Sequence, residues 1–148
     1  MSQNADNYNS PLLTESIVRE FMEDRDTDTT LLDTDGRTWT EKDIRAAMVR
    51  AVQMWNNTPP HTIRIKNPLY PPNTYTMLLG TQIQLLQARL NNYIRNDIDY
   101  STGGTQASPF KARIKHFKTL LAELKPEFQN LASMEKQQKN LSRAWRVL

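Results

Sequence analysis

Apolar side chains recur every three or four residues along much of this 148-residue chain, a spacing that places them on one side of an α-helix. The first such stretch follows Thr14, whose hydroxyl can cap a short helix. The second follows Thr40 and Asp43, which approximate a capping box, and predicts a helix over about 41–57. Pro59 should end this helix, because the residue before a proline avoids helical torsions.

Two longer helices are predicted, over about 74–99 and about 109–145. Asn73 caps the first, whose roughly 26 residues would span about 39 Å, more than a compact domain of this size needs. The second carries a heptad-like apolar seam that continues past Leu131 to Trp145 after one three-residue step. Pro126 should kink or break this helix, because its ring clashes with the carbonyl one turn earlier.

Turn-forming residues interrupt the helical pattern. Asp35-Gly36 tolerates the positive φ angles of a tight turn and predicts a small β-hairpin. Residues 58–72 hold five of the 8 prolines and predict an extended, protruding loop. The polar residues 1–12 are expected to form a flexible arm, and residues 13–148 one mainly α domain of three to four helices.

Charge is distributed unevenly along the chain. Residues 1–43 carry 11 acidic and 4 basic side chains, a net of −7, whereas residues 44–148 carry 5 acidic and 15 basic ones, a net of +10. Such asymmetry indicates either an anionic partner or a second copy whose acidic part meets the basic part. The apolar fraction of 38% is low for a globular domain, so neighbouring subunits are expected to complete part of the core.

The sequence contains few residues in patterns typical of a catalytic or metal-binding site. The chain has no cysteine, and neither of its two histidines stands in a metal or triad spacing. Asp97 and Asp99 are interpreted as turn-forming residues, and the alternating aspartates from Asp24 lack the glycine of a calcium loop. No apolar run is long enough to span a bilayer. We therefore expect no enzymatic activity, cofactor, metal or membrane association.

Basic residues in the last predicted helix follow nearly the same spacing as the apolar seam. They could contact nucleic-acid phosphates or an acidic protein surface, or they could form an ordinary solvated face. The aromatic residues lie on apolar stripes and no helix-turn-helix is evident, so any DNA contact would be nonspecific. The basic stripe comprises Lys111, Lys115, Lys118, Lys125, Lys136, Lys139, Arg143 and Arg146.

The middle helix carries amides where a freely solvated helix usually carries lysine and glutamate. This face either hydrogen-bonds another protein surface or is a neutral solvent face. Together with the proline loop and the last tryptophan, it supplies the candidate subunit interface. The candidates are Trp55, Pro59, Pro60, Ile63, Ile65, Gln84, Gln87, Asn91 and Trp145.

Three sequence clusters together resemble small helical virion structural proteins of tailed bacteriophages. They are WNNTPP at 55–60, YIRN at 93–96 with YSTGG at 100–104, and the segment from Lys139-Asn140 through Trp145. The resemblance covers about residues 31–148, and Pro126 departs from the unbroken C-terminal helix of a simple connector pattern. It implies a non-enzymatic subunit of a symmetric ring around the DNA channel, with the 139–145 segment in the oligomeric packing and the 58–72 loop reaching a neighbour.

This resemblance implies a homo-oligomer in the head–tail connector, or neck, made in the host bacterial cytoplasm and carried in the virion. Its partners would be portal, adaptor, terminator, tail or baseplate proteins, with nonspecific contact to genomic DNA. The alternatives are a tail or baseplate structural protein and a small nonspecific DNA-binding accessory protein. From the charge asymmetry we also expect the acidic part of one subunit to dock on the basic stripe of a neighbour, through a head-to-tail interface.

Overall fold

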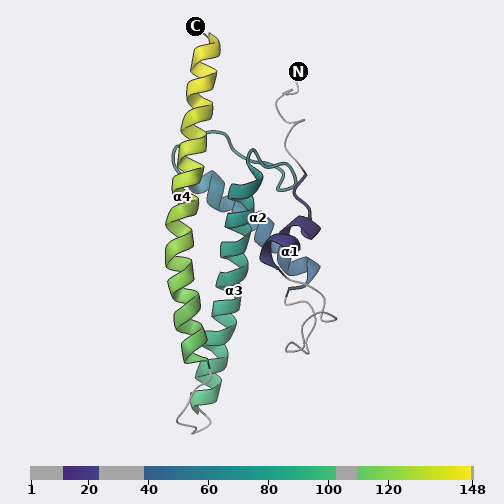
Figure 1. Cartoon of the computed structure of the whole chain (residues 1–148), viewed down its shortest axis with the longest axis vertical. Helices are drawn as coiled ribbons and strands as arrows, with labels where there is room; N and C mark the ends of the chain where they lie inside the picture. Colours follow the sequence, from purple (N-terminus) through teal and green to yellow (C-terminus); the bar gives the residue numbers. More distant parts are fainter. Residues whose placement is uncertain (1–11, 24–38, 103–109, 148) are drawn as a thin grey trace.

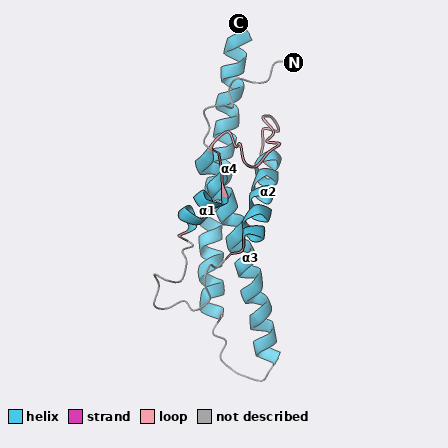
Figure 2. Cartoon of the chain, turned by 90° about the vertical axis from the view of Figure 1, so that its right-hand side faces the viewer, coloured by secondary structure: helices cyan, strands magenta, loops and turns pink. Residues whose placement is uncertain are grey.

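The computed structural model describes residues 12–23, 39–102 and 110–147, and this part of the chain is mainly helical, as predicted. Two long antiparallel helices lie side by side, a third crosses them near one end, and a short helix packs on the crossing helix and on one long helix (Figures 1 and 2). No strand occurs among the described residues. The helices are α1 (Glu15–Met22), α2 (Glu41–Asn57), α3 (Thr74–Thr102) and α4 (Lys111–Val147).

Local capping signals set the starts of the first three helices. The Thr14 hydroxyl accepts from the Ile17 amide at the start of α1. Thr40 and Asp43 form the predicted reciprocal capping box, so α2 has the predicted bounds. Asn73 Oδ1 accepts from the Thr76 amide at 3.1 Å, which confirms the predicted cap of α3.

Pro126 does not break α4, which runs without interruption from Lys111 to Val147. Proline leaves the carbonyl of Ala122 without its helical donor, but Ala122 and Pro126 both lie on the exposed side, where water can bond that carbonyl. Figure 1 shows a gentle bow along α4 in place of the sharp kink or break that the sequence predicts. Burial of Phe128 two residues later holds the helix against the core on its other side.

The loop between α2 and α3 is non-helical, as predicted, but its middle lies back against its own domain. The Asn56 amide donates to the Ile65 carbonyl at 3.0 Å and accepts from the Ile65 amide at 2.8 Å. The Trp55 Nε1–H donates to the Ile63 carbonyl at 2.9 Å, and Ile65 is buried. These bonds fasten the loop to the end of α2.

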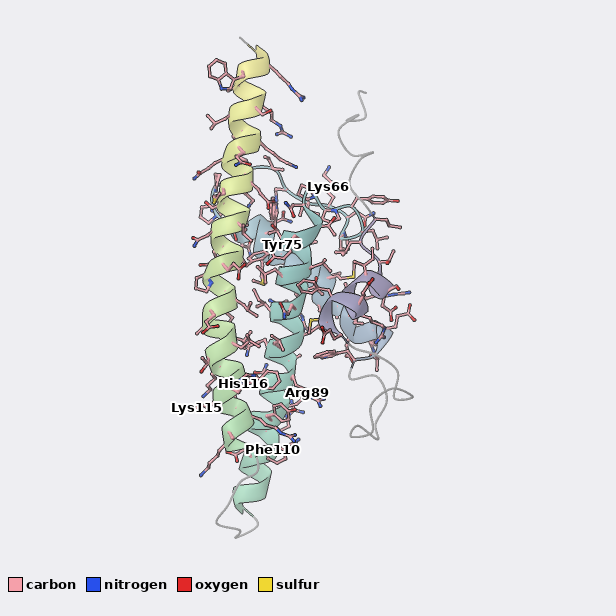
Figure 3. The ribbon with its side chains drawn as sticks, in the orientation of Figure 1. Lys66, Tyr75, Arg89, Phe110, Lys115 and His116 are labelled. Carbon is pink, nitrogen blue, oxygen red and sulfur yellow. The ribbon has the colours of Figure 1, made fainter. Side chains whose placement is uncertain are left out.

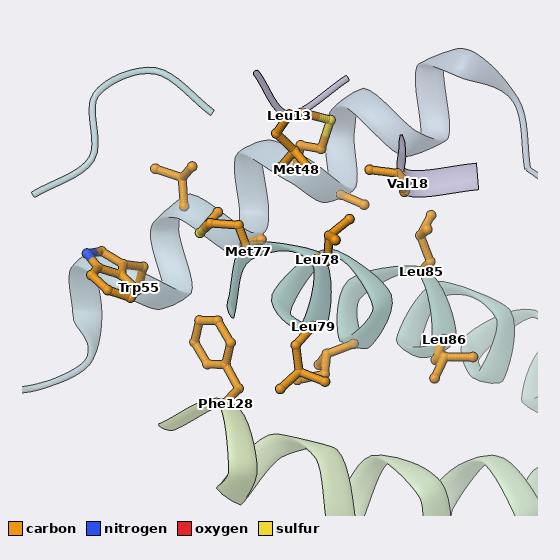
Figure 4. Packing of buried hydrophobic residues seen from close by; sticks show 14 of the residues in the cluster. Leu13, Val18, Met48, Trp55, Met77, Leu78, Leu79, Leu85, Leu86 and Phe128 are labelled. Atoms are coloured by element: carbon orange, nitrogen blue, oxygen red, sulfur yellow. The ribbon is translucent and has the colours of Figure 1, made fainter. Parts of the chain in front are cut away.

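The core lies where α2, α3 and α4 meet (Figure 4). Phe128 of α4 points between the other two helices toward Trp55 of α2, and both rings are fully buried. Gly80 makes the close approach possible, because a methyl group there would stand 2.7 Å from Phe128 Cε2 and 3.1 Å from the Ala51 Cβ. We call this junction of Trp55, Gly80 and Phe128, together with Lys136 beside them, the crossing zone.

Three predictions concern parts of the chain outside the described residues. They are the hairpin at Asp35-Gly36, the acidic run from Asp24 to Asp28, and nearly all of the N-terminal arm.

Candidate interaction surfaces

The predicted basic stripe of α4 divides into two groups in the structure. Lys111, Lys115 and Lys118 are exposed near the start of the helix, where Figure 3 labels Lys115. Lys125 is exposed but bonds α3 through Gln87 Oε1, at 3.1 Å. Arg143 and Arg146 are exposed near the other end, and Lys139 is half-buried.

Lys136 is completely buried and is therefore not part of an exposed basic stripe. Its Nζ donates to the backbone carbonyls of Trp55 and Thr58, the latter at 2.6 Å, and stands 5.3 Å from the centroid of the Trp55 ring. The last turn of α2 carries no basic side chain of its own, so Lys136 supplies from α4 the positive charge that favours a helix C-terminus. Burial lowers the pKa of Lys136 by disfavouring its charged form.

From Met134 onward, the apolar seam predicted from the sequence no longer coincides with the side of α4 that is buried. Beyond Phe128 the buried positions are Ala132 and Lys136, whereas Met134, Leu141 and Trp145 of the predicted seam are exposed. At 100° per residue, these last three lie within about 40° of one another and about 100–140° from Phe128. They form a second apolar stripe, here called the tip stripe, which the core of this chain does not cover.

The end of α4 projects beyond α3 (Figure 1). Near this end, Asn140 bonds the loop between α2 and α3, its Nδ2 donating to Thr62 Oγ1 at 2.9 Å. We call residues 141–147 the α4 tip. Leu141 is 61% exposed and Trp145 is 74% exposed, and Met134 below them is 54% exposed. Large side chains this exposed in a row are typical of an interaction surface.

Most of the nine predicted interface residues are engaged within the chain. Trp55 and Ile65 are buried in the domain, and Pro60 and Ile63 are half-buried. On the amide-rich face, Gln84 donates to Met54 Sδ, and Gln87 donates to Asn91 Oδ1 while accepting from Lys125. Those that remain exposed are Pro59, Asn91 and Trp145.

An arginine and aromatic cluster, not predicted from the sequence, lies where the second half of α3 faces the start of α4 (Figure 3). The Tyr93 ring lies 6.0 Å from Phe110 and 5.4 Å from Phe117, measured between centroids. Guanidinium carbons of Arg89 and Arg113 stand 5.3 and 5.8 Å from the Tyr93 centroid, within cation–π range. The signal was available in the sequence, since Arg89 and Tyr93 are four residues apart on a predicted helix.

A half-buried carboxylate, that of Glu135, lies beside the crossing zone. Thr76 Oγ1 of α3 donates to Glu135 Oε1 at 2.6 Å, and Glu135 Oε2 is buried without a hydrogen-bond partner in the described part of the chain. Burial raises the pKa of Glu135, and the Thr76 bond and the nearby charge of Lys139 oppose that rise.

A shallow groove of about 150 Å³ lies between α2 and α3. Its lining includes Asp43, Arg50 and Arg89 together with Trp39 and several alanines. No nucleophile and base stand together there. Across the described ranges, no group of three or more histidine, aspartate or glutamate side chains is placed to hold a metal ion. None of the described helices has the length and hydropathy needed to cross a membrane.

Comparison with known proteins gives no match: no family model fits the chain, and neither curated proteins nor solved structures show significant similarity to it.

Proposed function

We propose that this chain is a non-enzymatic structural subunit of a tailed-bacteriophage virion. In this proposal it assembles as a symmetric ring in the head–tail connector and joins portal-side and tail-side proteins around the DNA channel. The sequence resemblance supports the placement in a virion, and the exposed tip stripe supports assembly.

The tip stripe is the observation that carries the proposal. Met134, Leu141 and Trp145 lie along one side of a projecting helix, and covering a side chain of this size contributes about 1.5–3 kcal/mol. A chain that functions alone gains nothing in stability from them, whereas an assembling subunit can bury them against another protein.

The proposal is tested by locating the chain in particles from infected bacteria. Mass spectrometry of purified virions should detect it, and cryo-electron microscopy should place it in a ring at the neck. Density at the tail end instead would favour the alternative of a tail or baseplate protein. Absence from mature particles would contradict both structural roles.

A second candidate function is nonspecific DNA binding, and the exposed lysines near the start of α4 favour it. Lys111, Lys115 and Lys118 lie within about two turns of helix and are all exposed. Fluorescence anisotropy with a random duplex should then show an affinity that falls steeply between low and physiological salt. Replacing these three lysines with glutamine should flatten that dependence, and absence of binding at low salt would exclude this function.

A further inference from the structure

The α4 tip carries basic side chains as well as an apolar side. Residues 141–147 contain Arg143 and Arg146 and no acidic residue, and Lys139 lies just below them. Leu141 and Trp145 therefore lie among basic side chains. A surface that covers them well should offer apolar contact and negative charge.

The outer side of α1 has this complementary character. Ser16 and Glu20 are exposed on the side of α1 opposite Val18. Leu12, which precedes the helix, and Glu23, which caps its C-terminus, are also exposed. Leu12 is 42% exposed, and the opposite side of α1 faces the core through Val18. Arg19, the basic residue of this helix, already bonds the Glu15 carboxylate at 2.7 Å, so it leaves the outer side acidic.

These two surfaces cannot meet within one chain as it is folded. Figures 1 and 2 both show the end of α4 projecting past the top of α3, while α1 lies well below it. Figure 1 also places α3 between α4 and α1. Contact between them therefore requires a second copy.

We propose that the α4 tip of one copy docks on the outer side of α1 of a second copy. This inference deepens the proposed function and rests on it, because it names the contact through which subunits assemble. Leu141 and Trp145 pack near Leu12, while Arg143 and Arg146 face Glu20 and Glu23. The two surfaces differ, so the contact repeats from copy to copy and closes into a ring when the rotation permits.

Pairing of two tips with each other is the competing arrangement. It would cover the same apolar residues, but it would bring Arg143 and Arg146 of one copy against those of the other. Like charges at a contact oppose association, whereas the contact with α1 places opposite charges together.

Disulfide trapping in the full chain distinguishes the two arrangements, because the native chain has no cysteine. Ala144→Cys marks the tip and Ser16→Cys marks α1, and both are small exposed positions. The two variants are mixed, oxidised gently and separated by size, with a tag on one chain. Ala112→Cys, an exposed alanine at the other end of α4, is the matched control.

The 144–16 disulfide should form several-fold more than either the 112–16 or the 144–144 disulfide. A dominant 144–144 product, or equal yields of 144–16 and 112–16, would overturn the inference. Either result would leave the proposed function intact, since that is judged separately by the presence of the chain in virions.

Charge reversal provides a second readout on the same contact. Arg143→Glu with Arg146→Glu should weaken self-association measured by sedimentation velocity. Mixing this variant with one that carries Glu20→Lys and Glu23→Lys should restore association. Failure of the mixture to associate better than either variant alone would contradict the proposed pairing of charges.

Discussion

The crossing zone and the α4 tip both contain an aromatic and a basic side chain of α4, but these side chains are buried in the first region and exposed in the second. In the crossing zone Phe128 and Lys136 are completely buried, and even the ammonium group has protein partners. In the tip, Trp145 and Arg143 are both exposed. The difference shows that the position of α3 and α2 along α4, and not residue type, decides which side chains of α4 are buried in the core and which are exposed.

The largest expected effect comes from the centre of the crossing zone. Phe128→Ala removes a fully buried ring that points from α4 between α2 and α3, and it should lower the free energy of unfolding by about 3–5 kcal/mol. Leu141→Ala is the control, because Leu141 is exposed and its loss should change that free energy by less than about 0.5 kcal/mol. Urea denaturation followed by circular dichroism measures both, and equal effects of the two substitutions would refute the distinction between the regions.

Substitution of Lys136 tests whether its buried ammonium group contributes to the stability of the fold. Lys136→Met keeps the apolar stem but removes the donor to the carbonyls of Trp55 and Thr58, so stability should fall by about 1–3 kcal/mol. The exposed Lys118→Met should be nearly neutral. A Lys136→Met protein as stable as the parent in the same denaturation experiment would show that the buried ammonium contributes no net stability.

Glu135 gives the smallest effect, and it depends on pH. Burial raises the pKa of Glu135 in the folded state above its usual 4.5. The folded state therefore binds the proton more tightly than the unfolded state does. Stability conferred by this group is therefore present at low pH and declines as pH rises through the raised pKa. Glu135→Gln keeps an acceptor for Thr76 and removes the charge, so the variant should be more stable than the parent at pH 7.

Thermal unfolding at a series of pH values measures this difference. The advantage of Glu135→Gln should shrink as the pH falls toward 4.5, where the parent is also protonated. Glu123→Gln, an exposed substitution on the same helix, should show no such trend. An advantage of Glu135→Gln that did not change with pH would contradict the assignment.

Sequence patterns predicted the helices and their caps, because these depend on residues close together in the chain. The capping box at Thr40 and Asp43 and the cap at Asn73 are bonds between residues three apart, and the helices they begin were predicted closely. The two long helices are also observed, because their apolar spacing is regular over many turns. The mainly α class follows from these elements.

Tertiary contacts account for what the sequence did not predict. Apolar spacing predicts that the seam continues from Leu131 to Trp145. In the structure the buried residues of this segment are Ala132 and Lys136, where α4 meets the end of α2. The spacing places Lys136 in the basic stripe with exposed lysines, whereas the structure buries it. The fastening of the proline loop through Asn56 and Ile65 likewise depends on a contact nine residues apart that has no local signature. Trp145 in a subunit interface stays a prediction.

Removal of the α4 tip tests most directly whether the crossing zone stabilises the fold while the C-terminal end of α4 mediates assembly. A chain ending at Asn140 keeps the bond to Thr62 and all of the crossing zone. Its unfolding midpoint in urea, measured on the monomer at low concentration, should match that of the full chain, and sedimentation velocity at high concentration should show that self-association is lost. A truncated chain that unfolds at much lower urea, or one that associates as well as the full chain, would contradict this account.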